Sequence, residues 1–147
     1  MKILITTDWY KPIINGVVTS VENLRKGLLC AGHEVRILTL STDMHSKIDG
    51  NVYYVASVSA GMVYEHARFN LHMPEVILQD IVKWKPDIVH SQCEFSTFWF
   101  ARKIANECQI PLVHTYHTDY EQYTHYFCFS HAMGIKMARA FSRKVLS

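Results

Sequence analysis

Five short apolar runs, separated by longer segments of helical periodicity, constrain what this chain can fold into. The runs predict strands and lie at residues 3–6, 35–40, 52–55, 87–90 and from residue 111. Helices are predicted between them, over residues 17–28, 74–84 and 95–108. Because strands alternate with helices, we expect an α/β fold in which a mostly parallel sheet carries helices on both faces.

The segments between these elements are less regular. Residues 41–51 and 56–70 are polar or mixed and are predicted to be loops. Gly32 lies where the end of a helix favours glycine. One face of the third predicted helix carries mostly apolar side chains, namely Phe95, Phe98, Ala101, Ala105 and Cys108.

The composition is that of a single globular domain of 147 residues. The formal net charge is only +2, from 15 Lys plus Arg and 13 Asp plus Glu, which argues against nucleic acid as a partner. The four cysteines are far apart, which favours a reduced cytoplasmic protein without disulfides. No apolar run approaches the roughly 18 residues of a membrane helix, and the first run ends at Asp8, too early for a signal peptide.

Ligands of an open parallel sheet bind at the carboxyl ends of its strands, and three loops are predicted there: residues 8–16, 91–96 and 115–126. In the first, Asn15 and Gly16 precede a helix, where free amide groups and the helix dipole favour an anion. Gly16 could equally serve only to turn the loop, because neither glycine-rich phosphate motif is present.

The other two loops carry titratable side chains. His117 is a candidate hydrogen-bond donor or proton shuttle, with a backbone-bonding histidine as the alternative. Glu94 could bind sugar hydroxyls or complement a helix dipole, and Cys93 is a reactive thiol or an inert core residue. A metal site is disfavoured, since no His-Glu-x-x-His motif occurs; its ligands would be His114, His117, Asp119 and His125.

Two segments suggest contact with a membrane surface. The last predicted helix separates Lys136, Arg139 and Arg143 from an apolar side formed by Met133, Met137, Phe141 and Val145. Such a helix binds an anionic membrane or packs its apolar side on the sheet. The stretch with Met62, Phe69, Leu71 and Met73 is expected to be exposed. The chain ends within this last helix, so we expect a fragment of a longer protein, with a frayed helix at a true terminus as the alternative.

Several blocks together resemble glycosyltransferase family 4. Residues 1–20 are similar to the start of that family, and Gly32-His33-Glu34-Val35 is similar to its block before the second strand. The segments 86–90 and 110–118 are similar to its fourth and fifth strands. The block Thr115-Tyr116-His117-Thr118, with residues 123–126, most resembles the diacylglycerol glucosyltransferases of bacterial membranes.

The resemblance implies a GT-B fold, in which two Rossmann-like domains enclose the active site. Residues 1–147 would be an incomplete N-terminal, acceptor-binding domain, and the C-terminal nucleotide-sugar domain would be absent. The family is retaining and metal-independent, so no cofactor is expected besides the nucleotide-sugar donor. The implied reaction moves a hexose, glucose from UDP-glucose, to a lipid acceptor such as diacylglycerol. This chain by itself is expected to be inactive.

By match to the family, Gly16 and Asn15 would lie near the donor diphosphate, and His117 would be the catalytic residue beside the transferring sugar. Glu94 and Tyr116 would lie on the acceptor side. Residues 95–99 depart from the pattern, because many members have a glycine there and this chain has bulky side chains. The implied location is the cytoplasm, peripheral to the inner face of the cell membrane.

Two other functions stay open. The transferase could use another acceptor, such as phosphatidylinositol, a sugar or a cell-wall precursor. The chain could also be a stand-alone, non-catalytic binding module. A dinucleotide-dependent oxidoreductase is disfavoured, because the glycine fingerprint is missing and residues 41–43 offer only a weak ribose-binding acid.

Overall fold

The computed structural model describes residues 1–59, 68–70 and 72–117. The chain divides into two compact units, Met1–Thr115 and Tyr116–Ser147. All the helices and strands of the described residues belong to the first unit. None of these helices is long and apolar enough to cross a membrane.

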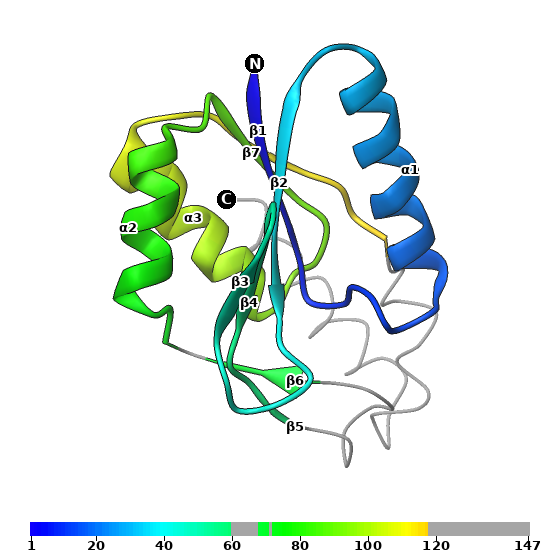
Figure 1. Cartoon of the computed structure of the whole chain (residues 1–147), viewed down its shortest axis with the longest axis vertical. Coiled ribbons are helices and arrows are strands. Elements are labelled where there is room, and N and C mark those ends of the chain that lie inside the picture. The colour runs from blue at the N-terminus through cyan, green and yellow to red at the C-terminus, as the bar shows by residue number, and fades with distance from the viewer. Residues whose placement is uncertain (60–67, 71, 118–147) are drawn as a thin grey trace, which may run out of the picture. The chain divides into compact units, whose positions relative to one another are not determined.

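A six-stranded sheet forms the centre of the first unit (Figure 1). Its order is β3 (Lys47–Asp49), β4 (Val52–Val55), β2 (Glu34–Leu40), β1 (Lys2–Thr7), β7 (Ile88–Ser91) and β8 (Leu112–His114). All neighbours pair in parallel except β3, which is antiparallel to β4. The predicted α/β architecture with a mostly parallel sheet is confirmed.

Helices cover both faces of this sheet, as Figure 1 shows. Helix α1 (Gly16–Cys30) packs its apolar stripe on one face, while α2 (Glu75–Trp84) and α3 (Ser96–Cys108) cover the other. The strands contribute to both cores by alternation, since Leu4 lies in the α2/α3 core and Ile5 in the α1 core. Gly32 follows α1 with φ of 80°, the left-handed conformation that favours glycine.

Four sequence predictions need correction. The segments 41–51 and 56–70 are not only loops, because they contain β3, β5 (Val58–Ser59) and β6 (Arg68–Phe69). All three residues of β3 are exposed, so backbone pairing holds the strand and no apolar pattern reveals it. Phe95 precedes α3 and is exposed, whereas Met73 packs into the α2/α3 core and is buried. Phe69, as expected, is exposed.

The strand order places two loops side by side. The chain runs outward from β1 to β2 and β4, then returns to the other side of β1 with β7 and β8. Open α/β sheets bind ligands at such a reversal, in the crevice at the carboxyl ends of the two central strands. Here these ends are Thr7 and Ser91, and they are followed by Asp8 and Gln92.

Candidate functional site

Asp8 lies at the reversal point of the sheet, directly after β1, and its side chain is buried. Its Oδ1 accepts a hydrogen bond of 2.9 Å from the backbone N–H of Thr97, in the first turn of α3. Its Oδ2 is also buried and has no hydrogen-bond partner among the residues that the structure describes. A carboxylate from another element therefore caps α3, whose own N-cap residue Phe95 makes no side-chain cap.

Burial raises the pKa of Asp8 from the usual 3.8 to about 6. The hydrogen bond from the backbone N–H of Thr97 opposes this rise, and the negative charge of Glu94 adds to it. Carboxyl groups with a pKa shifted toward neutrality are common at functional sites. Among the described carboxyl groups at this edge of the sheet, Asp8 is thus the one with the most strongly shifted pKa.

Glu94 lies in the turn between β7 and α3 and is only 4% exposed. Its Oε1 is 3.6 Å from Nε2 of His114, the last residue of β8. The Phe98 ring packs edge-on against the His114 ring, with 5.2 Å between centroids and 71° between planes. Glu94 therefore joins the ends of two neighbouring strands, in addition to any contact with a ligand.

Thr115 fixes the first position after β8. Its N–H donates a 2.9 Å hydrogen bond to the carbonyl of Ser91, and its Oγ1 lies 2.8 Å from Nε2 of His90. Nε2 of Gln92 donates to the same Oγ1 at 3.5 Å. β7 therefore holds the end of β8, from which the chain continues to Tyr116 and His117.

Tyr116 and His117 follow Thr115 and belong to the second compact unit. Tyr116 is 40% exposed and His117 is half-buried. Each makes interactions, so neither side chain is free. Their assignment to acceptor and catalysis stays a prediction.

Asn15 and Gly16 lie where the sequence predicts them, at the start of α1. Asn15 is the N-cap, and its Oδ1 accepts a 2.8 Å hydrogen bond from the N–H of Val18. Apart from its chain neighbours and the backbone of its own helix, no atom of the described residues lies within 4 Å of the position that a Cβ on Gly16 would take. The first amide groups of any helix lack a partner within it, so a ligand anion can approach them at Gly16.

Glu22 of α1 holds the loop that leads to Gly16. Its Oε1 accepts a hydrogen bond from the buried Tyr10 hydroxyl, and its Oε2 lies 2.6 Å from Nζ of Lys11. Arg25 adds a second cation at 3.8 Å from Oε1. Desolvation opposes ionisation of Glu22, but the bonds from Lys11 and Tyr10 outweigh it and lower its pKa.

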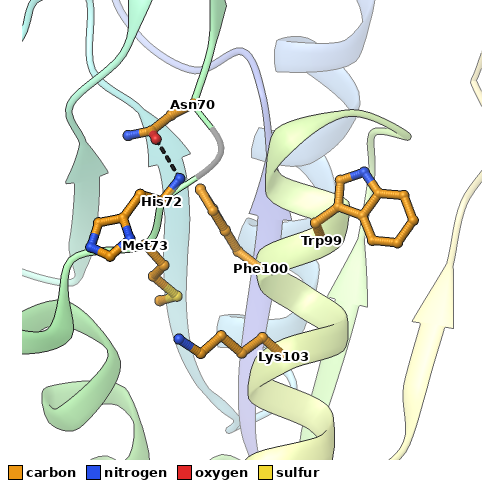
Figure 2. Close-up of a pocket in the computed structure, with 6 residues that line it drawn as sticks. All are labelled: Asn70, His72, Met73, Trp99, Phe100 and Lys103. Carbon is orange, nitrogen blue, oxygen red and sulfur yellow. Dashed lines mark hydrogen bonds between the residues drawn. The ribbon is translucent and has the colours of Figure 1, made fainter.

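A pocket of about 350 Å³ opens beside α3. Asn70, His72 and Met73, which precede α2, line one side, and α3 supplies Trp99, Phe100 and Lys103. Figure 2 shows Met73, Phe100 and Lys103 facing one another across it, with the Trp99 indole turned away. Asn70 joins the pocket to the carboxyl edge of the sheet, because its N–H donates a 3.0 Å hydrogen bond to Oγ of Ser96.

The structure thus separates the predicted site residues into groups. Glu94 lies at the reversal of the sheet, and Asn15 and Gly16 end the neighbouring loop. The Cys93 thiol is buried and burial raises its pKa, which favours the inert alternative. The described residues contain no group of three or more His, Cys, Asp and Glu arranged for a metal ion. Several predictions fall outside the described residues, namely those for Asp119, His125, Met62 and Leu71 and for the last predicted helix with its basic and apolar sides.

Sequence reasoning did not select Asp8 or Thr97. The available signal was position, since Asp8 is the first polar residue after the strand at the centre of the sheet. Its burial and its contact with Thr97 depend on the pairing of β1 with β7, which the sequence pattern does not specify.

Comparisons with known proteins agree on one family. Residues 14–146 match the profile of Glycosyltransferase Family 4. The alpha-monoglucosyldiacylglycerol synthase of Streptococcus pneumoniae is 36% identical over 127 residues, covering 86% of this chain and 29% of that protein. The enzyme of the same name from Acholeplasma laidlawii is 36% identical over 128 residues, covering 86% of this chain and 32% of that protein.

A third relative is an uncharacterized glycosyltransferase of Methanocaldococcus jannaschii, 30% identical over 122 residues, which cover 80% of this chain and 31% of that protein. The matched segment therefore corresponds to about a third of the length of each of these curated relatives.

Proposed function

Because the chain belongs to glycosyltransferase family 4, we propose that it forms the acceptor-side part of an enzyme that transfers glucose from UDP-glucose to diacylglycerol. The observation that carries this proposal is the 36% identity to two proteins named as alpha-monoglucosyldiacylglycerol synthases, over 86% of this chain. The reversal point of the sheet supports it, since that is where such folds bind ligands.

The proposed reaction retains the anomeric configuration and needs no metal ion. Gly16 would receive the donor diphosphate at the start of α1, with Asn15 keeping the helix end in shape through its bond to Val18. His117 would position the transferring sugar and stabilise the charge that develops during transfer. Tyr116 and Glu94 would act on the acceptor side, Glu94 from its buried place against His114.

We also propose that residues 1–147 are an incomplete N-terminal domain and do not transfer glucose alone, since the relatives are about three times longer than the matched segment. In the whole enzyme a C-terminal domain would bind the nucleotide. Because the proposed acceptor is a lipid, the transfer would take place at a membrane surface, which we propose to be the cytoplasmic face.

The test is a chimaera in which this chain replaces the matching segment of the Streptococcus pneumoniae synthase. Incubation with radiolabelled UDP-glucose and diacylglycerol vesicles, followed by lipid extraction, should give a labelled glucolipid, also in the presence of EDTA. If a folded chimaera binds UDP but labels only phosphatidylinositol, a sugar or a cell-wall precursor, the labelled compound would replace diacylglycerol as the proposed acceptor. Labelling of none of them would contradict the transferase proposal.

Catalysis by His117 has its own test in the same chimaera. Loss of a group that assists at the reacting centre typically lowers kcat by about 10²- to 10⁴-fold, which is the result expected for His117→Ala. The matched control is His45→Ala, because His45 is 89% exposed and far along the chain from the proposed centre. Equal kcat values for the two variants would refute the role of His117.

A further inference from the structure

The pocket beside α3 has the chemistry of an amphiphile site. Its floor is apolar and buried, formed by Met73 at 3% and Phe100 at 4% exposure. Its rim carries two side chains with hydrogen-bond donors, Lys103 and His72, which are both exposed. Ligand pockets typically combine such an apolar lining with a few polar groups.

The pocket is built by contacts that hold its rim in place. The Asn70 side chain donates a hydrogen bond to the carbonyl of Ala56 and accepts one of 2.6 Å from the N–H of His72, which Figure 2 shows as a dashed line. Its backbone N–H is bonded to Ser96. Met73 is part of the α2/α3 core. The backbone at His72 and the floor at Met73 are thus held without a ligand.

The ammonium of Lys103, one of the two donors on the rim, is available to a ligand. The Lys103 ammonium makes no ion pair with any residue in the described parts of the chain. The neighbouring Arg102 lies instead over the Trp99 ring, 5.8 Å from its centroid. In Figure 2 the Lys103 side chain extends along the pocket toward Met73. Its ammonium can therefore donate to an oxygen held above the apolar floor.

The size of the pocket limits what enters it. A volume of about 350 Å³ is near the lower limit of about 300–1,000 Å³ for ligand pockets. It admits the glycerol ester region of a lipid and the first methylene groups of an acyl chain, and leaves the rest of the chain outside. Ester carbonyls are neutral acceptors that match the donors on the rim.

The pocket also lies close to the proposed site of transfer. Ser96 is the first residue of α3, two positions after Glu94, and it accepts the hydrogen bond from Asn70. A lipid bound in the pocket therefore lies beside the carboxyl edge of the sheet, where the acceptor hydroxyl is needed.

We propose that this pocket binds the acyl ester end of the neutral diacylglycerol acceptor, with Lys103 donating to an ester carbonyl and Met73 and Phe100 contacting the acyl chain. The inference rests on the proposed function for the identity of the lipid. The site itself is carried by the lining of the pocket and its place beside α3.

Binding can be measured without catalysis, by NMR of the chain with ¹³C-labelled methionine methyl groups. Titration with dioctanoylglycerol should shift the Met73 signal to saturation. The signal of Met44, which is 73% exposed, serves as the control within the same spectrum. An unchanged Met73 signal, or equal shifts at both methionines, would overturn the proposal. A soluble phosphatidic acid that shifts Met73 at lower concentration than dioctanoylglycerol would also overturn it, by making the pocket an anion site.

The length of the acyl chain gives a second criterion. Each methylene that enters an apolar pocket tightens binding by about fourfold. Shifts at Met73 should therefore strengthen from dibutanoyl- to dihexanoylglycerol and then level off once the pocket is full. Continued strengthening with every longer chain would indicate adsorption to a surface and contradict the pocket.

Variants link the pocket to the reaction in the chimaera. Lys103→Met should raise the KM for diacylglycerol about tenfold and leave kcat and the KM for UDP-glucose unchanged, and Lys103→Arg should restore most of the loss. The matched control is Lys83→Met in the last turn of α2, outside the pocket. If the chimaera forms glucolipid and its Lys103→Met variant has a normal KM for diacylglycerol, the pocket proposal is refuted and the proposed function stands. If the Met73 signal shifts to saturation but the chimaera forms no glucolipid, the proposed function is refuted and the pocket proposal stands.

Discussion

The carboxylate of Asp8, at the end of the central strand, accepts a 2.9 Å hydrogen bond from the backbone N–H of Thr97 at the start of α3. This bond links the two loops that flank the reversal of the sheet. It also leaves the second oxygen of a buried carboxyl without a partner in the described part of the chain. Such a group costs stability when it is charged, and sites that bind ligands often carry that cost.

Replacement of Asp8 by Asn should therefore stabilise the protein above pH 6. The pKa of Asp8 is about 6 in the folded chain against 3.8 in the unfolded chain. The folded state thus holds the proton more tightly, so the contribution of Asp8 to stability is full below pH 3.8 and is lost as the pH rises through 6. The loss amounts to about 2–3 kcal/mol. Asn keeps the acceptor oxygen for Thr97 without the charge.

Urea unfolding of wild type and Asp8→Asn between pH 3.5 and 8 measures this difference. The gain should grow between pH 4 and 6 and then stay constant. Asp49→Asn in the exposed strand β3 is the matched control and should change stability by less than about 0.5 kcal/mol at all pH values. A gain from Asp8→Asn that does not depend on pH would contradict the buried, charged carboxyl.

Glu94 and His114 should be energetically coupled. Both side chains are less than 10% exposed, and Oε1 of Glu94 is 3.6 Å from Nε2 of His114. A double-mutant cycle of Glu94→Gln and His114→Asn, measured by chemical unfolding, should give a coupling free energy of about 0.5–3 kcal/mol. If Glu94 served only to contact an acceptor, the two substitutions would be additive in the ligand-free protein.

Removal of the cap at α1 should weaken the helix end that carries Gly16. Asn15→Ala removes the acceptor for the N–H of Val18 and should cost about 1 kcal/mol in thermal or urea unfolding. Asn15→Ser retains a side-chain acceptor and should cost only a few tenths of a kcal/mol. Equal costs for Ala and Ser would show that the cap bond contributes nothing to stability.

A cluster between β2 and α2, formed by Arg36, Asp80 and Trp84, should depend on the shape of the Arg36 side chain as well as its charge. The Arg36 guanidinium lies 4.6 Å from the centroid of the Trp84 ring and 3.1 Å from Oδ2 of Asp80. Arg36→Lys keeps the charge but loses the guanidinium that lies over the Trp84 ring and its fork of donors, so it should cost about 1 kcal/mol. Differential scanning calorimetry should show a lower Tm for this variant, whereas Lys26→Arg on α1 leaves it unchanged.

Thiol reactivity should differ between two cysteines of the first unit. Cys30 is exposed, whereas Cys93 is buried and burial raises its pKa. In a Cys108→Ser, Cys128→Ser background, alkylation followed by mass spectrometry should label Cys30 quickly and Cys93 only after unfolding. Rapid labelling of Cys93 in the native protein would show that its environment is accessible to solvent.

Much of the architecture follows from local sequence patterns. The strand over residues 52–55 was predicted with the bounds that the structure has, because its apolar run is buried within the sheet. The helical periodicity of residues 17–28 likewise predicts α1, in which Val21 is fully buried. These patterns are set by which face of an element is buried, which local periodicity records directly.

What the sequence did not reveal depends on distant segments. β3 has no buried side chain, and its place is set by pairing with β4 across the turn at Gly50. Met73 is predicted to be exposed, yet it is buried because it packs into the core formed with α2 and α3. The unusual state of Asp8 likewise requires α3, which is encoded far along the chain. Family resemblance predicted the candidate residues near Gly16 and His117, and their roles stay predictions.

The parallel pairing of β1 with β7 also determines when the loops at the carboxyl edge of the sheet can come together during synthesis. Ile3 lies opposite Ile88, and Asp8 meets Thr97 across 89 positions of sequence. Contacts of such long range form late, after the entropy of closing the intervening loop has been lost. A ribosome-bound chain that stops before α3 therefore cannot form the contact between Asp8 and Thr97. That contact should arise in one step with the packing of α3, and the Thr97 amide should exchange its hydrogen only when the first unit opens.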